Sequence, residues 1–282
     1  MRRAKRALPP TAKRAAGAVL RAYGMATSPL RGAPDFMLAG AKRCGSTSLF
    51  TYLLEHPDVP TRFPAAEGKK GTHYLDRHSE RSKAWYRSHF AIRRPGRVFG
   101  EASTYYFSHP ACARDAAALA PSAKIVILLR EPAERAFSHY RDEVKNGIET
   151  LSFADALAAE PDRIGPELER MRKDRHYYSF VHEHLSYTSW GEYAGHLERW
   201  LDAFGPARVL VLRSEDMFSA PDEVYRECTD FLGLRPFEPT FRRHNAAPVG
   251  QADEAVLGRL REHYAPHNNR LVGLLPSAPS WA

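Results

Sequence analysis

Glycine, hydroxyl and basic residues gather between residues 40 and 48, directly after the apolar run Phe36 to Ala39. Lys42 and Arg43 lie in the turn after Gly40, and Gly45-Ser46-Thr47-Ser48 opens a run with helical spacing. A strand, a glycine-bounded turn and a helix start present unpaired backbone N–H groups and the positive end of the helix dipole to an anion. This stretch therefore predicts a phosphate site. The alternative is an ordinary strand-to-helix turn with chance polar residues.

A second stretch repeats this arrangement. Residues 124–129 are apolar and β-branched, which indicates a strand buried on both faces of a sheet. Arg130 follows the strand, and Pro132 starts a helix that carries Ser138. Ligands of open α/β sheets bind beyond the carboxyl ends of the strands, so two such units converging on one ligand indicate more than one phosphate group.

The first stretch departs from the nucleoside-triphosphate P-loop, G-x-x-x-x-G-K-[ST], because Ser46 stands where that motif has lysine. No apolar strand ends in a clear magnesium-binding aspartate either. Both observations weigh against the main rival, a P-loop kinase using ATP. The other rival is a non-catalytic module that binds anionic surfaces through its basic N-terminal tail.

Strand and helix patterns alternate along the chain, which predicts a single α/β domain with a central parallel sheet flanked by helices. Further strands are expected at 97–101 and 208–212, and residues 60–84 are expected to form a loop. Helices are expected over 110–119, from Pro132, around 85–90, and over 190–204, 221–232, 253–264 and 266–275. Residues 147–189 are expected to be a mobile or substrate-facing insertion that is helical in part.

The first 34 residues form a separate basic tail. They hold eight basic and no acidic residues, whereas the rest of the chain has 33 of each sign, which argues against nucleic-acid binding. A frayed, solvated tail is the favoured interpretation. An amphipathic helix over 11–24 in peripheral contact with an anionic membrane is the alternative. Three widely spaced cysteines and no long apolar run indicate a reducing, cytoplasmic location.

At this point the motifs resemble a known family. Gly40-Ala-Lys-Arg-Cys-Gly-Ser-Thr-Ser-Leu49 resembles the 5′-phosphosulfate loop of PAPS-dependent sulfotransferases. Leu129-Arg-Glu-Pro-Ala-Glu-Arg-Ala-Phe-Ser-His-Tyr140 resembles their 3′-phosphate signature, and Gly100-Glu-Ala-Ser-Thr-Tyr-Tyr106 is similar to a turn of the heparan-sulfate-type and bacterial members. The resemblance covers about residues 35–275, so residues 35–282 are expected to form a sulfotransferase domain of P-loop-like fold.

The resemblance implies that PAPS donates a sulfuryl group to an acceptor without a metal ion. The 5′ end is then held by the backbone of Cys44, Gly45, Ser46 and Thr47, the hydroxyls of Ser46, Thr47 and Ser48, and the charge of Arg43, with Lys42 as a further candidate. Arg130 and Ser138 hold the 3′-phosphate, and Arg243 is a candidate in a loop that closes over PAPS.

Two departures from the family pattern concern the chemistry. Arg43 replaces the usual lysine, and arginine can stabilise charge but cannot donate its proton at neutral pH. The position of the glutamate base in heparan-sulfate-type enzymes is Gly71 here. His73 is therefore the favoured general base, because an imidazole suits hydroxyl deprotonation near neutral pH. Glu101 is the alternative base.

The predicted activity is sulfuryl transfer to a hydroxyl or amine of a small molecule, a glycolipid or a saccharide. The arginine- and alanine-rich composition suggests a bacterial source. The sequence leaves the acceptor open.

Overall fold

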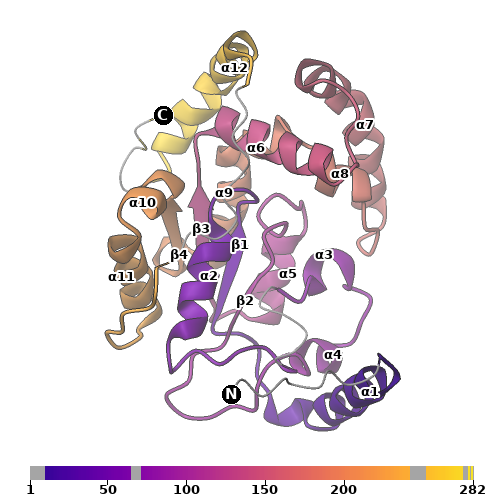
Figure 1. The fold of residues 1–282 in the computed structure, drawn as a ribbon, viewed down its shortest axis with the longest axis vertical. Helices are drawn as coiled ribbons and strands as arrows, with labels where there is room; N and C mark the ends of the chain where they lie inside the picture. The colour runs from indigo at the N-terminus through magenta and orange to yellow at the C-terminus, as the bar shows by residue number, and fades with distance from the viewer. Residues whose placement is uncertain (1–9, 65–70, 242–251, 276–278, 280, 282) are drawn as a thin grey trace, which may run out of the picture.

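The computed structural model describes residues 10–64, 71–241, 252–275, 279 and 281. Four parallel strands form one sheet with the order β2-β1-β3-β4 (Figure 1). They are β1 (Phe36–Gly40), β2 (Gly100–Ala102), β3 (Lys124–Leu129) and β4 (Val209–Arg213). In the register, Phe36 lies opposite both Gly100 and Lys124, and Ile125 lies opposite Val209. The predicted fold class is confirmed.

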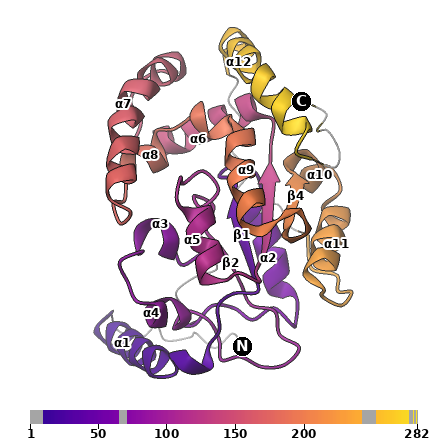
Figure 2. The ribbon, with the colours of Figure 1, turned by 180° about the vertical axis from the view of Figure 1, so that it is seen from behind.

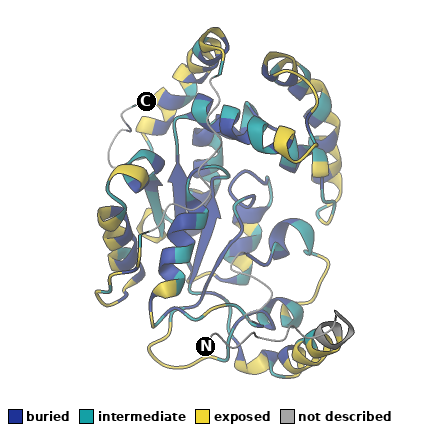
Figure 3. Cartoon of the chain, viewed as in Figure 1, coloured by how far each residue is buried: buried dark blue, intermediate teal, exposed yellow. Residues whose placement is uncertain are grey.

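Helices cover both faces of this sheet. Helix α2 (Ser46–Glu55) lies on one face, next to α11 (Pro221–Leu232). Helices α5 (Cys112–Leu119) and α9 (Tyr193–Phe204) lie on the opposite face, which Figure 2 shows from behind. Because both faces are covered, every residue of β1 is buried, as are five of the six residues of β3 (Figure 3). This explains why both strands are continuous apolar runs.

Helix α6 (Pro132–Lys145) begins at the carboxyl end of β3. Its start was predicted because proline suits the first helical position. The Glu131 side chain caps the helix, since its carboxylate accepts hydrogen bonds from the amides of Ala133 (3.1 Å) and Glu134 (2.7 Å). Figure 1 shows α6 above the sheet, with α12 (Glu254–Val272) beside it. The carboxyl ends of the strands therefore face a layer of helices.

The prediction of two C-terminal helices is wrong, because α12 is continuous through Pro266. A proline inside a helix removes one backbone hydrogen bond. Against this, α12 buries a row of residues with helical spacing, among them Leu257, Leu260, Tyr264 and Leu271. Each fully buried apolar side chain contributes about 1.5–3 kcal/mol, so the packed face outweighs the lost bond.

The segments between the main elements hold more regular structure than the sequence indicated. The predicted loop 60–84 includes α3 (Tyr74–Arg77), and the helix predicted near 85–90 is α4 (Lys83–Arg87). The insertion 147–189 contains α7 (Phe153–Lys173), which continues through Pro161 and Pro166, and α8 (Phe180–His184). The strand expected at 97–101 is shorter and starts at Gly100. The remaining elements are α10 (Ser214–Ser219), η1 (Ser28–Leu30), η3 (Ser189–Gly191) and η4 (Pro206–Arg208).

Residues 10–26 form helix α1, so the favoured interpretation of a frayed tail is wrong for this part of the chain. Arg21 donates a hydrogen bond to the carbonyl oxygen of Phe63 (2.6 Å), which ties the helix to the body. Several of its apolar side chains are exposed nonetheless: Val19 is 69% exposed, and Tyr23 is 49% exposed although its ring also packs against Phe63. Figure 1 places α1 at the opposite end of the sheet from α6.

Candidate active site

The turn between β1 and α2 has the geometry of an anion cradle. Gly45 caps α2 with φ 87°, a left-handed conformation that glycine adopts without strain. Among the described residues, no acceptor contacts the amides of Gly45, Ser46 and Thr47. The side chain of Cys44 is buried, and its amide donates to the Ala41 carbonyl at 3.4 Å. The unpaired donors therefore lie at residues 45–47, with the buried Ser46 hydroxyl beside them.

Arg43 joins the two predicted anion-binding units. Its backbone has φ 74°, and its Nε donates a hydrogen bond to the Ser138 hydroxyl on α6 at 3.2 Å. Its Nη1 lies 3.2 Å from a carboxylate oxygen of Asp142, one turn further along the same helix. The two stretches that the sequence predicted to converge are thus in direct contact.

Arg130 lies at the mouth of the second unit, one residue beyond β3. Its guanidinium is 25% exposed and forms an ion pair with Glu134 at 3.3 Å. Its carbonyl accepts a hydrogen bond from the Tyr193 hydroxyl at 2.9 Å, which fixes the backbone at the strand end. The side chain is therefore positioned at the carboxyl edge of the sheet and remains accessible to a ligand.

Lys42 turns into a buried charged cluster. Its ammonium donates to a carboxylate oxygen of Glu143 at 2.7 Å and to the carbonyl of Glu183 at 3.4 Å. Burial alone would raise the pKa of Glu143, but hydrogen bonds from His139, His184 and Lys42 lower it well below its usual range. Glu143 is therefore an ionised anchor that connects the cradle to α6 and α8.

His73 precedes α3 and is paired with a buried carboxylate. Its Nδ1 donates to Asp76 Oδ2 at 2.9 Å, and the Asp76 side chain is fully buried while that of His73 is 27% exposed. Burial alone would lower the pKa of His73, but the hydrogen bond and the charge of Asp76 outweigh it and raise the pKa. Among the described residues, none forms a hydrogen bond with Nε2 of His73.

The histidine segment is connected to the cradle through α8. Arg77, at the end of α3, donates from Nε to the Glu183 carboxylate at 2.9 Å. The carbonyl of the same Glu183 accepts from Lys42. His73, α8 and the phosphate-loop candidate therefore belong to one contiguous polar region.

Glu101 is fully buried at the second residue of β2. Its carboxylate accepts hydrogen bonds from the Thr72 amide and hydroxyl and from the hydroxyls of Tyr86, Ser103 and Tyr106, at 2.7–3.4 Å. Ser103 in turn accepts from the His73 amide at 3.2 Å. A carboxylate held by five donors and closed to solvent anchors the loop that carries His73.

At Gly71, where the resemblance led us to expect a glutamate base, the structure leaves no room for a side chain. A Cβ at this residue would lie 1.8 Å from Ser103 Oγ and 2.5 Å from the Ala102 carbonyl oxygen. The Gly71 amide donates to that same carbonyl at 2.6 Å, so the close approach is part of the loop's own structure. A longer side chain cannot fit here without moving the loop.

Several residues of this region were missed or left unassigned by sequence reasoning. Asp76 follows His73 by three residues, a spacing that could have indicated the pair. Glu143 gave no local signal, because it lies 101 residues from Lys42. Arg135, in the second motif, is fully buried and donates to the Tyr187 carbonyl. Arg243 lies outside the described residues.

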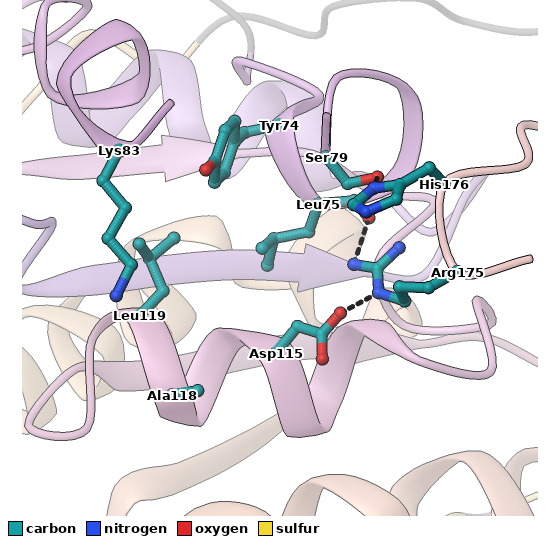
Figure 4. Close-up of a pocket in the computed structure, with 9 residues that line it drawn as sticks. All are labelled: Tyr74, Leu75, Ser79, Lys83, Asp115, Ala118, Leu119, Arg175 and His176. Carbon is teal, nitrogen blue, oxygen red and sulfur yellow. Dashed lines mark hydrogen bonds and ion pairs between the residues drawn. The ribbon is translucent and has the colours of Figure 1, made fainter. Parts of the chain in front are cut away.

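A pocket opens beside α3 (Figure 4). Its volume is about 190 Å³, and its lining includes Tyr74 and Leu75, which directly follow His73. Arg175 lines it at one end and donates to the Asp115 carboxylate and, at 2.9 Å, to the Leu75 carbonyl. Lys83 lies at the other end of the pocket, as Figure 4 shows. The pocket thus adjoins the histidine segment.

The fold and this site define a P-loop-like α/β protein, and comparison with known proteins gives the family. Residues 33–245 match the model of the sulfotransferase domain. A sulfotransferase crystal structure from Alicyclobacillus acidocaldarius superposes with a TM-score of 0.71 at 30% identity, covering 89% of this chain and 99% of that one. The chain therefore belongs to the sulfotransferase domain family.

Two human relatives carry more specific names. The chain is 29% identical to bifunctional heparan sulfate N-deacetylase/N-sulfotransferase 3 over 72% of its own length and 22% of the relative's. It is 27% identical to heparan sulfate glucosamine 3-O-sulfotransferase 6 over 88% of its length and 73% of the relative's. The chain thus spans about a fifth of the bifunctional relative. Within the described residues, no helix is long and apolar enough to cross a membrane.

Proposed function

We propose that this chain transfers a sulfuryl group from PAPS to a hydroxyl or amine of an acceptor. The observation that carries the proposal is the hydrogen bond between Arg43 and Ser138, which joins the cradle after β1 to the helix after β3. PAPS has a 5′-phosphosulfate and a separate 3′-phosphate, so it needs two anion sites on one side of the protein. Membership of the sulfotransferase domain family supports the same donor.

The residues at the cradle fit such a donor. The unpaired amides at residues 45–47, the Ser46 and Thr47 hydroxyls and the Arg43 guanidinium would hold its 5′ end. Arg130 and Ser138 would hold the 3′-phosphate, with Arg243 and Ser48 as further candidate contacts. PAPS supplies an activated sulfuryl group whose departure leaves negative charge on the phosphate. Arg43, which Ser138 and Asp142 hold in place, would stabilise this charge as it develops.

His73 acts as the general base in this proposal. Because its Nδ1–H is committed to Asp76, the lone pair lies on the accessible Nε2, which can accept the acceptor's proton. Asp76 also stabilises the imidazolium that results. Glu101, the alternative base, is assigned instead as a positioning residue, since its oxygens are occupied and closed to solvent.

Lys42 is proposed to brace the cradle rather than to bind the sulfuryl group. Its ammonium is already bonded to the ionised Glu143, and a buried ion pair of this kind is costly to break. The pair holds the turn between β1 and α2 against α6, and so helps to fix the position of Arg43.

A saccharide is the proposed acceptor class, ahead of a small molecule or a glycolipid. Both human relatives are named for heparan sulfate, one for N-sulfation and one for 3-O-sulfation, so an amine and a hydroxyl acceptor are both in scope. The pocket beside α3 is the proposed place for part of such an acceptor, because Tyr74 and Leu75, which follow His73, line it and Lys83 lies at one end.

The test is transfer of radiolabel from [35S]PAPS to a panel of acceptors. The panel pairs an amino-sugar oligosaccharide carrying free amines with its N-acetylated counterpart, and adds a phenol and a glycolipid. We expect label in at least one saccharide, with loss of transfer in Arg43→Ala. Label in the phenol alone would reject a saccharide as the acceptor but would still support PAPS as the donor. Absence of transfer to every acceptor, together with phosphate transfer from ATP and magnesium, would reject the function.

The exposed apolar face of α1 supports a peripheral membrane contact for the tail. Val19 and Leu20 are exposed, and the first 34 residues carry no acidic group to repel an anionic lipid headgroup. Sedimentation with anionic vesicles should remove the full chain from solution, and Val19→Glu should keep it there. Equal binding to zwitterionic vesicles would contradict the electrostatic part of this proposal.

We also propose a cytoplasmic location, since all three cysteines are unpaired and buried.

A further inference from the structure

Three side chains with metal-binding atoms meet where the C-terminal helix α12 crosses the start of α9. They are Glu192, which precedes α9, and His263 and His267 on α12. We propose that they form a structural site for a divalent transition-metal ion, with zinc as the natural ion. Nothing in the proposed transfer chemistry uses these residues, so the site is separate from the catalytic region.

The distances suit such an ion. Glu192 Oε1 lies 3.0 Å from His263 Nε2 and 3.9 Å from His267 Nε2, and the three ligand atoms lie within 4.8 Å of one another. Zinc binds imidazole nitrogen and carboxylate oxygen at about 2.0–2.2 Å, which places tetrahedral ligand atoms roughly 3.3 Å apart. Rotation of these partly exposed side chains would bring the ligand atoms to that spacing.

The secondary structure holds the two histidines in place. Residues four apart on a helix share one face, and the two imidazole rings lie 5.3 Å apart with an interplanar angle of 31°. Between them in sequence, Tyr264 is fully buried and donates its hydroxyl to the Thr188 carbonyl at 2.8 Å. This anchor fixes the rotation of α12, so that both imidazoles face Glu192.

The chemistry of the three ligands is selective. Two neutral imidazoles and one carboxylate favour zinc, cobalt, nickel or copper over magnesium or calcium, which prefer oxygen ligands. The ligand side chains are 35–43% exposed, so an ion can enter and water can complete its coordination. Two histidines and a carboxylate, without a cysteine, also leave the site insensitive to thiol oxidation.

The ion would fasten the C-terminal helix to the body of the domain. A second contact between the same helices, in which Arg270 Nε donates to Glu198 at 2.7 Å, lies one turn further along α12. Glu192 is followed by Tyr193, whose hydroxyl supports the Arg130 carbonyl. The metal bridge therefore braces α12 against the segment that supports the proposed 3′-phosphate site.

The test uses the full chain without a histidine tag, stripped with a chelator and titrated with Zn²⁺ by calorimetry and with Co²⁺ by visible absorption. We expect one site of micromolar affinity and Co²⁺ d–d bands typical of low coordination number. Zinc at about 100-fold above its Kd should raise Tm by about 5 °C for a domain of this size. His263→Ala, His267→Ala and Glu192→Gln should each remove the bands and the Tm increase.

Arg270→Ala is the matched control. It breaks the neighbouring contact between α9 and α12 but leaves all three ligands, so it should retain one-to-one zinc binding and the Tm increase. The proposal is overturned if the wild type shows no stoichiometric zinc binding. It is equally overturned if zinc binds His263→Ala and Glu192→Gln as it binds the wild type, because the ion would then reside elsewhere.

Discussion

The most informative prediction about catalysis concerns the hydrogen-bonded pair His73 and Asp76. Asp76→Asn keeps the shape of the side chain but removes the charge that stabilises the imidazolium. A hydrogen bond to a charged group contributes about 1.5–3 kcal/mol, and Asp76 is fully buried, so solvent screens little of this contribution. Loss of that energy from the transition state corresponds to a fall of about 10–100-fold in kcat/KM. His73→Ala, which removes the base itself, should cost about 100–10,000-fold.

The pH profile gives the second readout. A general base must be neutral, so kcat/KM rises with pH as His73 loses its proton. The bond to Asp76 raises the pKa of His73 above its ordinary value of 6.5, and burial opposes this shift. Asp76→Asn removes the negative charge that raises the pKa of His73. Burial then lowers this pKa, so the rise of kcat/KM with pH moves to lower pH.

The assay is initial-rate transfer from labelled PAPS between pH 5 and 9, with circular dichroism to confirm folding. His78→Ala is the matched control, because this histidine lies at the other end of α3, packs on Trp85 and is linked to Asp76 and His73 only through longer-range charge. Its kcat/KM should stay within about three-fold of wild type. Retention of wild-type rates by His73→Ala, or an unchanged profile in Asp76→Asn, would refute the role of the pair.

Three further predictions concern the supports of the site. Glu101→Gln places an amide N–H opposite at least one of the five donors, which then has no acceptor. Thermal unfolding should therefore show a Tm lowered by about 2–5 °C. An unchanged Tm would contradict the role of Glu101 as an anchor. Gly71→Ala should lower both Tm and kcat, because its Cβ meets Ser103 at 1.8 Å, whereas Gly195→Ala, with open space around it, should be neutral or stabilising. The pKa of Glu143 is lowered in the folded state, so its stabilisation is complete above its unfolded pKa near 4.5 and is lost as pH falls further. Urea unfolding should therefore show a stability difference between wild type and Glu143→Gln that shrinks below pH 4.5.

The sheet and the two strand–turn–helix units that are proposed to bind anions could be located from the sequence because their signals are local. Buried parallel strands are continuous apolar runs, and the cradle is marked by glycine, hydroxyl and basic residues within nine positions. The helix after Pro132 was predicted for the same reason, since proline at its first turn is a local signal.

The rest depends on contacts between distant segments. Glu143 pairs with Lys42 across 101 residues, and Glu101 holds the Thr72 segment across 29. No window of the sequence shows either pair. The continuity of α12 through Pro266 was missed because tertiary packing outweighs the local cost of proline. Helix α3 was missed because its four residues are too few for a periodic pattern.

The central claim is that the turn after β1 and the helix after β3 bind one bisphosphorylated adenosine. Calorimetric titration with 3′-phosphoadenosine 5′-phosphate, beside ATP with magnesium, tests it most directly. We predict tight binding of the former, weakened about 10–100-fold in both Arg43→Ala and Arg130→Ala and unchanged in Arg172→Ala, an exposed arginine of α7. Tighter binding of ATP with magnesium, or an Arg43→Ala or Arg130→Ala variant that binds 3′-phosphoadenosine 5′-phosphate as well as the wild type, would contradict the account.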